Sequence, residues 1–394
     1  MSDVRHFDVV IAGGGLVGAS AARALAERGM RVAIFERRYF GAQASGVNYG
    51  GVRCQGRPEE QLPLAMRARR LWDRLPELIG IDGEFVRSGH LRLARRESDL
   101  DALDAWSAMA AGHGLPTTVL RGAAFRQRFP WLGDGAVGGS LCPSDGHANP
   151  RLVSPAFARA ARALGAQVHE TTPITSVVHD GVRFQISAQP AQGETIHVSA
   201  DWLLNTSGAW ANQIAGTFGE RVPMHAIYPN MWVTEPLPKC IGHNLGVYGG
   251  GVYARQVERG NCVIGGGRGT GNGEYAQPSA DTTRAVMREA CSLVPALRNA
   301  LLIRTWSGVE GETPDNNPII GPSRTTPQLL HAFGFSGGGF LLAPGVGDVL
   351  ADLVTTGETP TPIDAFAIDR FGGAASTDAD LPVSAGQPQA QPQP

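Results

Sequence analysis

Three glycines and one acidic residue near the start of the chain have the spacing of a dinucleotide-binding site. Gly13, Gly15 and Gly18 follow one apolar run, and Glu36 follows the next. Glycines at this spacing permit a tight turn, a close approach of pyrophosphate to the backbone and close packing of a helix on a strand. The helix that follows offers free N–H groups and a positive dipole end to the phosphates. Because Glu36 can accept hydrogen bonds from a ribose diol and repels a 2′-phosphate, the pattern predicts NAD or FAD rather than NADP.

Two later regions of the chain favour FAD. The first is the strand end Leu204–Trp210, with the sequence LNTSGAW. The second comprises residues 306–321, WSGVEGETPDNNPIIG, and residues 333–340, FGFSGGGF. In this order the motifs resemble those of the D-amino-acid oxidase superfamily of FAD-dependent oxidoreductases. Within it the chain is most similar to glycine and sarcosine oxidases, the flavin subunits of opine oxidases and hydrogen cyanide synthase, over residues 7–371.

The resemblance implies an α/β fold (α+β overall) of the glutathione-reductase type. A Rossmann-like FAD-binding domain then carries an inserted, mostly antiparallel β-sheet domain that holds the substrate. The last glycine cluster precedes a helix whose positive end would stabilise the anionic reduced flavin. The residues implied in cofactor binding are Gly13, Gly15, Leu16, Val17, Gly18, Glu36, Arg37, Ala44, Ser45, Asn48, Val177, Thr206, Ser207, Gly208, Trp210, Gly308, Gly337, Gly338, Gly339 and Phe340.

The same resemblance bears on whether the flavin is attached covalently. Relatives that tether it use a histidine in the loop that follows the second strand, or a cysteine in the C-terminal motif. Asn48 and Gly308 stand at these positions here, and neither can form the bond. FAD is therefore expected to bind non-covalently.

The reaction is also given by the resemblance. Family members transfer a hydride from an amine-bearing carbon to flavin N5, and the imine then hydrolyses. The cofactor performs the chemistry, while the protein positions the substrate and excludes water, so no dedicated catalytic acid or base is expected. The implied substrate is a small amine or N-substituted amino acid. The alternatives are a 2-hydroxyacid dehydrogenase and a flavin subunit that is active only with a partner.

Glu310 departs from the family pattern. Glycine oxidase and hydrogen cyanide synthase carry a carboxylate-binding arginine in a Gly-Leu-Arg-Pro segment, and the segment here is Gly308–Gly311, GVEG. A glutamate repels a substrate carboxylate and can instead hold a cationic amine or guanidinium. Either Glu310 faces the substrate, or it pairs with Arg304 or Arg53 in a structural role. Gly338 also replaces a histidine of some relatives, which is expected to leave room near the flavin.

A substrate carboxylate would then need another cation. Arg53 and Arg57 follow the flavin-facing loop directly, and arginine suits bidentate carboxylate binding. The alternative for each is a surface or ion-paired arginine. Tyr248 and Tyr253 lie on predicted strands of the substrate domain, where they either line the pocket or pack in its core.

The electron acceptor stays open between O2 and a protein or quinone partner. Lys239 is the only lysine of the chain and lies in a Pro-Leu-Pro-Lys turn that is expected to be exposed. This argues against the lysine-dependent oxygen site of sarcosine-oxidase-like members, although other members lack that lysine. A homo-oligomer or a larger partner subunit is compatible with the sequence.

The elements that position these residues follow two patterns. A helix expected at residues 19–28 lies between apolar strands, and a late helix is expected from residue 345. Residues 252–256 and 261–265 predict a hairpin, which is typical of an antiparallel sheet. The predicted FAD-binding domain comprises residues 1–83, 145–222 and 304–373, the substrate domain residues 84–144 and 223–303, and a disordered tail residues 374–394.

Composition limits the remaining function classes. A chain of 394 residues suits two interlocked domains. A net charge of −2 gives no indication of nucleic acid or an anionic membrane as partner. The N-terminal residues do not resemble a signal peptide and no apolar run has the length of a membrane span, so a cytoplasmic protein is expected. Five scattered cysteines without a C-x-x-C pair argue against a disulfide framework and against a metal site.

Overall fold

The computed structural model describes residues 4–372, so the tail expected at 374–394 lies outside the described residues. The first of two large sheets has the strand order β21-β22-β11-β1-β2-β8. Strands β22, β11, β1, β2 and β8 run parallel, as the Rossmann-type prediction requires. The bounds of this sheet are β1 Arg5–Ala12, β2 Val32–Phe35, β8 Gln167–His169, β11 Ile196–Asn205, β21 Ile319–Pro322 and β22 Leu329–Phe333.

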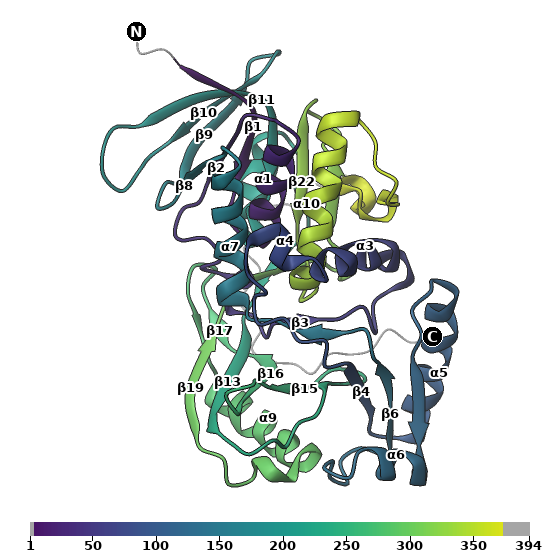
Figure 1. Cartoon of the computed structure of the whole chain (residues 1–394). Helices are drawn as coiled ribbons and strands as arrows, with labels where there is room; N and C mark the ends of the chain where they lie inside the picture. Colours follow the sequence, from purple (N-terminus) through teal and green to yellow (C-terminus); the bar gives the residue numbers. More distant parts are fainter. Residues whose placement is uncertain (1–3, 373–394) are drawn as a thin grey trace.

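Helices cover one face of this sheet and a β-ribbon covers the other (Figure 1). Along β1, Val9 and Ile11 belong to the helix-side core, whereas Val10 between them packs with the ribbon. This alternation follows from the two-residue period of a strand buried on both faces. The covering elements are α1 Leu16–Glu27, α3 Leu62–Trp72, α4 Leu75–Ile79, α7 Pro150–Ala163, α10 Gly339–Thr356 and the ribbon β9 Ile174–His179 with β10 Phe184–Ala188.

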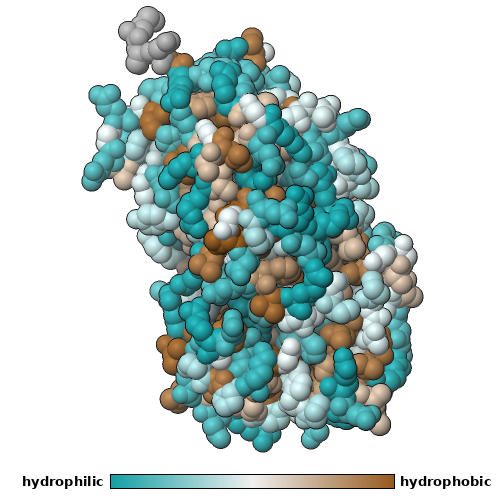
Figure 2. All heavy atoms as spheres, in the orientation of Figure 1, coloured by the Kyte–Doolittle hydropathy of each residue, from teal (hydrophilic) through white to brown (hydrophobic). Residues whose placement is uncertain are grey.

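Helix α10 is the central helix of this domain and packs against α1 and α3. A Cβ atom at Gly347 would lie 2.6 Å from Ser20, so only glycine allows α1 to come this close. By length and composition alone α10 could cross a membrane, but 67% of it is buried inside the protein, as in a core helix. Hydrophilic residues predominate on the face drawn in Figure 2, with apolar residues scattered among them. The cytoplasmic location stays a prediction.

The second large sheet has the order β19-β13-β16-β15-β14-β4-β6-β5 and is antiparallel except where β14 meets β4. The expected hairpin is present as β15 and β16. The bounds are β4 His90–Ala94, β5 Thr118–Arg121, β6 Gly138–Cys142, β13 Pro229–Pro236, β14 Asn244–Val247, β15 Val252–Gln256, β16 Asn261–Arg268 and β19 Leu302–Ser307. Its helices are α5 Glu97–Gly112, α6 Gly122–Arg128 and α9 Ala280–Leu293.

Three boundaries differ from the sequence-based expectation. The domain boundary at residue 304 falls inside β19, which pairs with β13 and so belongs to the second sheet. Helix α10 begins at Gly339 instead of residue 345, because burial of Phe340, Leu341 and Leu342 outweighs the poor helix propensity of its glycines and Pro344. Helix α1 begins at Leu16 instead of residue 19, directly after the glycine turn.

Short elements connect the two large sheets and carry much of the site. The loop at residues 44–51, which is expected to face the flavin, forms α2 (Ala44–Val47) and then enters β3 (Gly51–Val52), which pairs with β7 (Gly146–His147). Strand β12 (His225–Ile227) pairs with β20 (Glu310–Glu312). The remaining short elements are α8 Ala211–Thr217, β17 Thr270–Gly271 and β18 Ala276–Gln277.

The contact between α1 and α10 gives a first prediction. Replacing Gly347 with valine should lower the free energy of unfolding by about 1–3 kcal/mol, because the added methyl groups collide with the backbone of Ser20. Urea unfolding followed by circular dichroism measures the change. Thr355→Val on the exposed side of the same helix is the control and should change it by less than about 0.5 kcal/mol. Equal stability of the Gly347 variant and the wild type would contradict the packing described.

Candidate active site

A cavity of about 1920 Å³ extends from the carboxyl edge of the first sheet to the second sheet. Pockets for one small ligand have volumes of roughly 300–1,000 Å³, so this cavity has room for a dinucleotide together with a small substrate. Ligands of parallel α/β sheets bind at the carboxyl ends of the strands, and β1, β2 and β11 all end at the cavity.

The N-terminus of α1 opens on the first half of the cavity. Gly15 is its N-cap residue and supplies no side-chain hydrogen bond, while the Ser45 hydroxyl accepts the N–H of Leu16 at 2.8 Å. Gly13 has a φ of +104°, and a Cβ at Gly18 would collide with the Gly13 carbonyl oxygen. Glycine is therefore sterically required at Gly13 and Gly18, whereas the approach of pyrophosphate at Gly15 stays a prediction. A helix end with free N–H groups in a glycine cradle fits a pyrophosphate.

Glu36 lies at the end of β2, on the cavity wall. Its carboxylate accepts backbone N–H groups of Gly14 and Arg38, each at 2.7 Å. Burial raises the pKa of this carboxyl, and the two N–H groups oppose the rise by stabilising the charge. Each oxygen keeps a further lone pair for the hydroxyl groups of a ribose.

The N-terminus of α10 opens on the second half of the cavity. Its N-cap residue Gly338 supplies no side-chain hydrogen bond, and Gly339 and Phe340 line the cavity. The preceding N–H groups are already paired: Gly337 donates to Glu310 at 2.6 Å and Gly338 donates to the Phe335 carbonyl at 2.8 Å. The prediction that the glycine cluster offers N–H groups to a ligand therefore applies to the helix start and not to the whole turn.

The predicted cofactor residues gather along this one cavity, with three exceptions: Leu16, Gly18 and Gly308 do not line it. Leu16 and Gly18 lie behind the turn, within α1. A Cβ at Gly308 would collide with the side chain of Val47, so no tethering side chain fits there without displacing α2. Cofactor binding by each individual residue stays a prediction.

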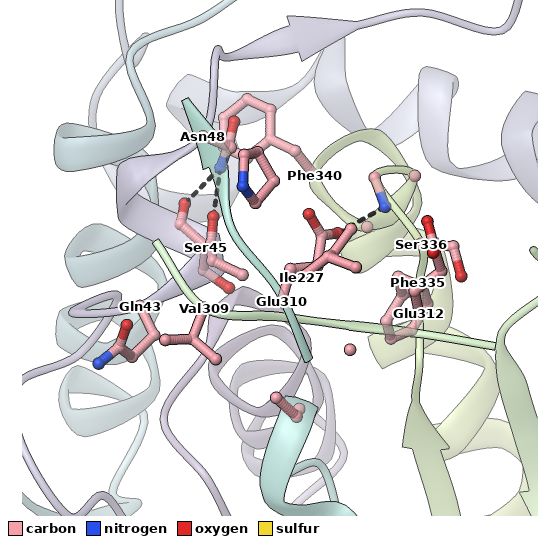
Figure 3. A pocket seen from close by; sticks show the side chains of 18 of the residues that line it. Gln43, Ser45, Asn48, Ile227, Val309, Glu310, Glu312, Phe335, Ser336 and Phe340 are labelled. Atoms are coloured by element: carbon pink, nitrogen blue, oxygen red, sulfur yellow. Dashed lines mark hydrogen bonds between the residues drawn. The ribbon is translucent and has the colours of Figure 1, made fainter. Parts of the chain in front are cut away.

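Glu310 lies at the start of β20 and points across the cavity towards the glycine turn (Figure 3). Within residues 4–372 no arginine nitrogen lies within 4.0 Å of its carboxylate, so the expected alternative of an ion pair with Arg304 or Arg53 is wrong. Burial raises its pKa to about 7, and the Gly337 N–H opposes that rise. Its neighbour Glu312 raises it further, although Glu312 itself is paired with Arg268 and His225.

Arg53 lines the same cavity. Its guanidinium donates to the Gln55 carbonyl at 2.7 Å, and in the described part of the chain it has no acidic partner within 4.0 Å. Desolvation lowers its pKa, while the more distant Asp145 opposes the change. The buried Asp145 instead accepts the backbone N–H groups of Cys54 and Gln55, at 2.8 and 2.9 Å, and so fixes the loop that carries Arg53.

Arg57, the second predicted clamp, has a different role. Its guanidinium donates to the Arg53 carbonyl, the Gln61 side chain and the Gly338 carbonyl, at 2.9–3.0 Å. It thereby joins the flavin-facing loop to the start of α10. A Cβ at Gly338 would lie 2.9 Å from this guanidinium, so the space expected where relatives have a histidine is filled by Arg57.

The two tyrosines predicted as pocket candidates lie in different surroundings. Tyr253 lines the cavity, packs edge-on against Tyr49 with 4.8 Å between ring centroids, and has its pKa raised by burial and by Glu310. Tyr248 does not line the cavity and packs beside Ala94, Leu100 and Leu103, so its prediction as a pocket residue is wrong. Lys239 is exposed, as expected.

Glu274 and Arg92 are residues of the site that were not predicted, whereas Arg37 and Trp210, which Glu274 contacts, were predicted. Arg37 stacks on Trp210 at 3.7 Å and pairs with Glu274, which reaches across from the turn between β17 and β18. Arg92 on β4 also faces the cavity. The alternation of apolar and polar residues from His90 to Ala94 was a usable signal for Arg92, whereas nothing local in the sequence marks Glu274.

Comparison with known proteins decides the family. The family model of FAD-dependent oxidoreductases, DAO, matches residues 8–353. The chain belongs to this family. It is 27% identical over 384 residues to glycine oxidase of Bacillus subtilis (strain 168), covering 93% of this chain and 98% of that protein.

Two further proteins are similar to most of this chain. Sarcosine oxidase subunit beta of Rhizobium meliloti (strain 1021) is 27% identical, with 93% of this chain and 88% of that protein covered. The crystal structure of L-proline dehydrogenase from P. horikoshii superposes with a TM-score of 0.86 at 27% identity, covering 94% and 98% of the two chains. The chain is thus an FAD-dependent oxidoreductase of amine or amino-acid donors, related to glycine and sarcosine oxidases, with the mixed α/β fold that the sequence predicted.

The mode of flavin attachment can be tested directly. Acid precipitation of the yellow holoenzyme should release all flavin into the supernatant, because the Asn48 amide cannot form a covalent bond to flavin and bonds only backbone groups, and Gly308 has no side chain. Absorbance of the supernatant and of the washed pellet measures the partition, with free FAD mixed into an unrelated protein as control. Flavin that stays in the pellet would contradict non-covalent binding.

Proposed function

We propose that this DAO enzyme oxidises the C–N bond of a small N-substituted amino acid, whose carboxylate binds Arg53 and whose nitrogen faces Glu310. The observation that supports this is the presence of both groups on one cavity beside the start of α10, where neither has an ion pair within residues 4–372. When bound, FAD accepts the hydride. The residues of the chain bind and orient the substrate and exclude water.

Arg53 is suited to the substrate carboxylate. A half-buried guanidinium without a counter-ion loses hydration and gains no attraction in return, and an incoming carboxylate restores the balance. The Asp145 carboxylate holds the loop by its backbone and leaves the guanidinium free to bind a ligand. Arg57 is less suited to this role, since protein oxygens accept three of its N–H groups and hold its guanidinium in place.

Glu310 is suited to the amine. A carboxyl with a pKa of about 7 is partly ionised at physiological pH, and its ionised form can accept a proton. Amines enter as ammonium ions and must be neutral before a hydride can leave the adjacent carbon. Glu310 would therefore take up that proton, a role that the sequence-based expectation of no catalytic base did not include.

The relatives support the substrate class in part. One is named for glycine and one for sarcosine, both small amino acids, and the second is one subunit of a larger enzyme. O2 and a protein or quinone acceptor both remain compatible with the site, and so does a partner subunit. The 2-hydroxyacid alternative is less well supported, because an uncharged hydroxyl gains little from a carboxylate at Glu310.

A substrate panel tests the proposal. Anaerobic mixing with N-methyl amino acids should bleach the visible flavin absorbance, whereas 2-hydroxyacids should not. Arg53→Met should raise KM for N-methylglycine about 10- to 100-fold, the loss expected for one charge-assisted bidentate interaction. N-methylethylamine, which has no carboxylate, is the matched control and should react equally poorly with both forms. If no amine in the panel bleaches the flavin, the proposal is refuted. If hydroxyacids alone bleach it, the 2-hydroxyacid alternative is favoured.

The raised pKa of Glu310 predicts a pH dependence. In the wild type kcat/KM should rise with pH through about 7, because the ionised carboxylate is the form that accepts the proton. Glu310→Gln should remove this limb and lower kcat/KM at pH 8 by about 100-fold, as is typical for loss of a general base.

The raised pKa of Glu310 also predicts how the stability of the protein depends on pH. Because its folded pKa lies above the value of 4.5 for an unperturbed carboxyl, the folded state binds more protons than the unfolded state between about pH 4.5 and 7. The wild type should lose stability relative to Glu310→Gln as the pH rises through that window. Thermal unfolding at pH 5 and pH 8 checks this, and a constant difference between the two proteins would contradict the raised pKa.

A further inference from the structure

Arg92 is a charged residue on the cavity wall that the proposed reaction does not use. It lies in the middle of β4, where Leu91 and Leu93 point into the core of the second domain. The alternate positions, His90 and Arg92, line the cavity. The two-residue period of the strand therefore directs the Arg92 side chain into the cavity and not to the outer surface.

The Arg92 guanidinium has no protein acceptor. Among residues 4–372 it makes no hydrogen bond of ordinary geometry and has no acidic oxygen within 4.0 Å. It lies 4.9 Å from the ring centroid of Tyr248 and so close to Gly56 that a Cβ there would collide with it. Arg95, three positions further along the chain, differs because it is paired with Glu289.

Arg92 and Arg53 together form a cationic wall. Desolvation lowers the pKa of Arg92 to about 10, and the charge of Arg53 contributes to this lowering. Both guanidinium groups stay protonated at neutral pH. The nearby His90 adds no third positive charge, because burial lowers its pKa well below its usual range and leaves it neutral. Two cations that repel each other without a counter-ion indicate an anionic ligand.

The cofactor phosphates are not that ligand. Their expected place is the N-terminus of α1, on the first sheet, whereas Arg92 lies on the second sheet. The anion must therefore belong to the substrate, or to a part of it beyond the carboxylate that Arg53 binds.

We infer that Arg92 binds a second anionic group, so that the preferred substrates are secondary amines with two carboxylates. This rests on the proposed function: one carboxylate binds Arg53, the nitrogen faces Glu310, and a carboxylate on the N-substituent reaches Arg92. Arg92 is in this account a residue that determines specificity. The hydride transfer itself is the same for substrates with one or two carboxylates.

The test compares substrates that differ only in the second carboxylate. N-methylglycine has one carboxylate, and N-(carboxymethyl)glycine and N-(2-carboxyethyl)glycine have two. The wild-type holoenzyme should show a kcat/KM at least 10-fold higher for one of the two dicarboxylates, with the difference mainly in KM. Arg92→Met should lower kcat/KM for that dicarboxylate about 10- to 100-fold and should change kcat/KM for N-methylglycine by no more than about twofold. Arg92→Lys should recover part of the loss for the dicarboxylate.

Controls separate this inference from structural damage and from the proposed function. Arg121→Met removes an exposed arginine of the same sheet and should change neither substrate. If Arg92→Met does not retain FAD, Arg92→Lys is used in its place. It should then show a partial fall in kcat/KM for the dicarboxylate alone. Equal kcat/KM for one and two carboxylates in the wild type, or an equal fall for both in the variants, would overturn the inference while leaving the proposed function intact. No reaction with any amine would instead overturn the proposed function.

Discussion

The site depends on the free-energy cost of burying charged side chains that have no oppositely charged partner in the protein. Arg53, Arg92 and Glu310 all face one cavity, and each could have been neutralised by a neighbour. The chain neutralises many other exposed and half-buried charges in this way, including Arg95 with Glu289 and Glu312 with Arg268. Leaving these three unpaired costs stability, which a ligand with carboxylates and an amine can recover on binding.

The fold holds these charges in place through uncharged or indirect contacts. Asp145 fixes the Arg53 loop by accepting two backbone N–H groups, and Arg57 joins that loop to the start of α10 through carbonyl oxygens. Glu310 receives the Gly337 N–H from the turn before α10. Hydrogen bonds thus connect the residues expected to bind the substrate with the start of α10, beside which the flavin ring is expected. None of these bonds gives Arg53 or Glu310 an oppositely charged partner.

Predictions from the sequence were most accurate where function depends on local backbone geometry. The glycine turn at residues 13–18 and the position of Glu36 on the cavity wall were both expected. Each depends on neighbours in the chain or on one close contact. The same local logic predicted the β15–β16 hairpin.

Side-chain roles that depend on tertiary register could not be derived in this way. Glu310 faces the cavity because β20 pairs with β12 in one register, and the sequence left an ion pair with an arginine equally open. Arg53 and Arg57 looked equivalent, yet only Arg57 donates to a carbonyl of a distant segment, that of Gly338. Tyr248 and Tyr253 were expected on similar strands, but one packs beside α5 and the other lines the cavity.

The most direct measurement is a crystal structure of the FAD-loaded enzyme with an unreactive thioether acid, (methylthio)acetate, in which sulfur replaces the amine nitrogen. The account predicts the carboxylate within hydrogen-bond distance of the Arg53 guanidinium and the sulfur on the side of Glu310, beside the start of α10. A carboxylate bound away from Arg53, or a sulfur on the side opposite Glu310, would contradict it.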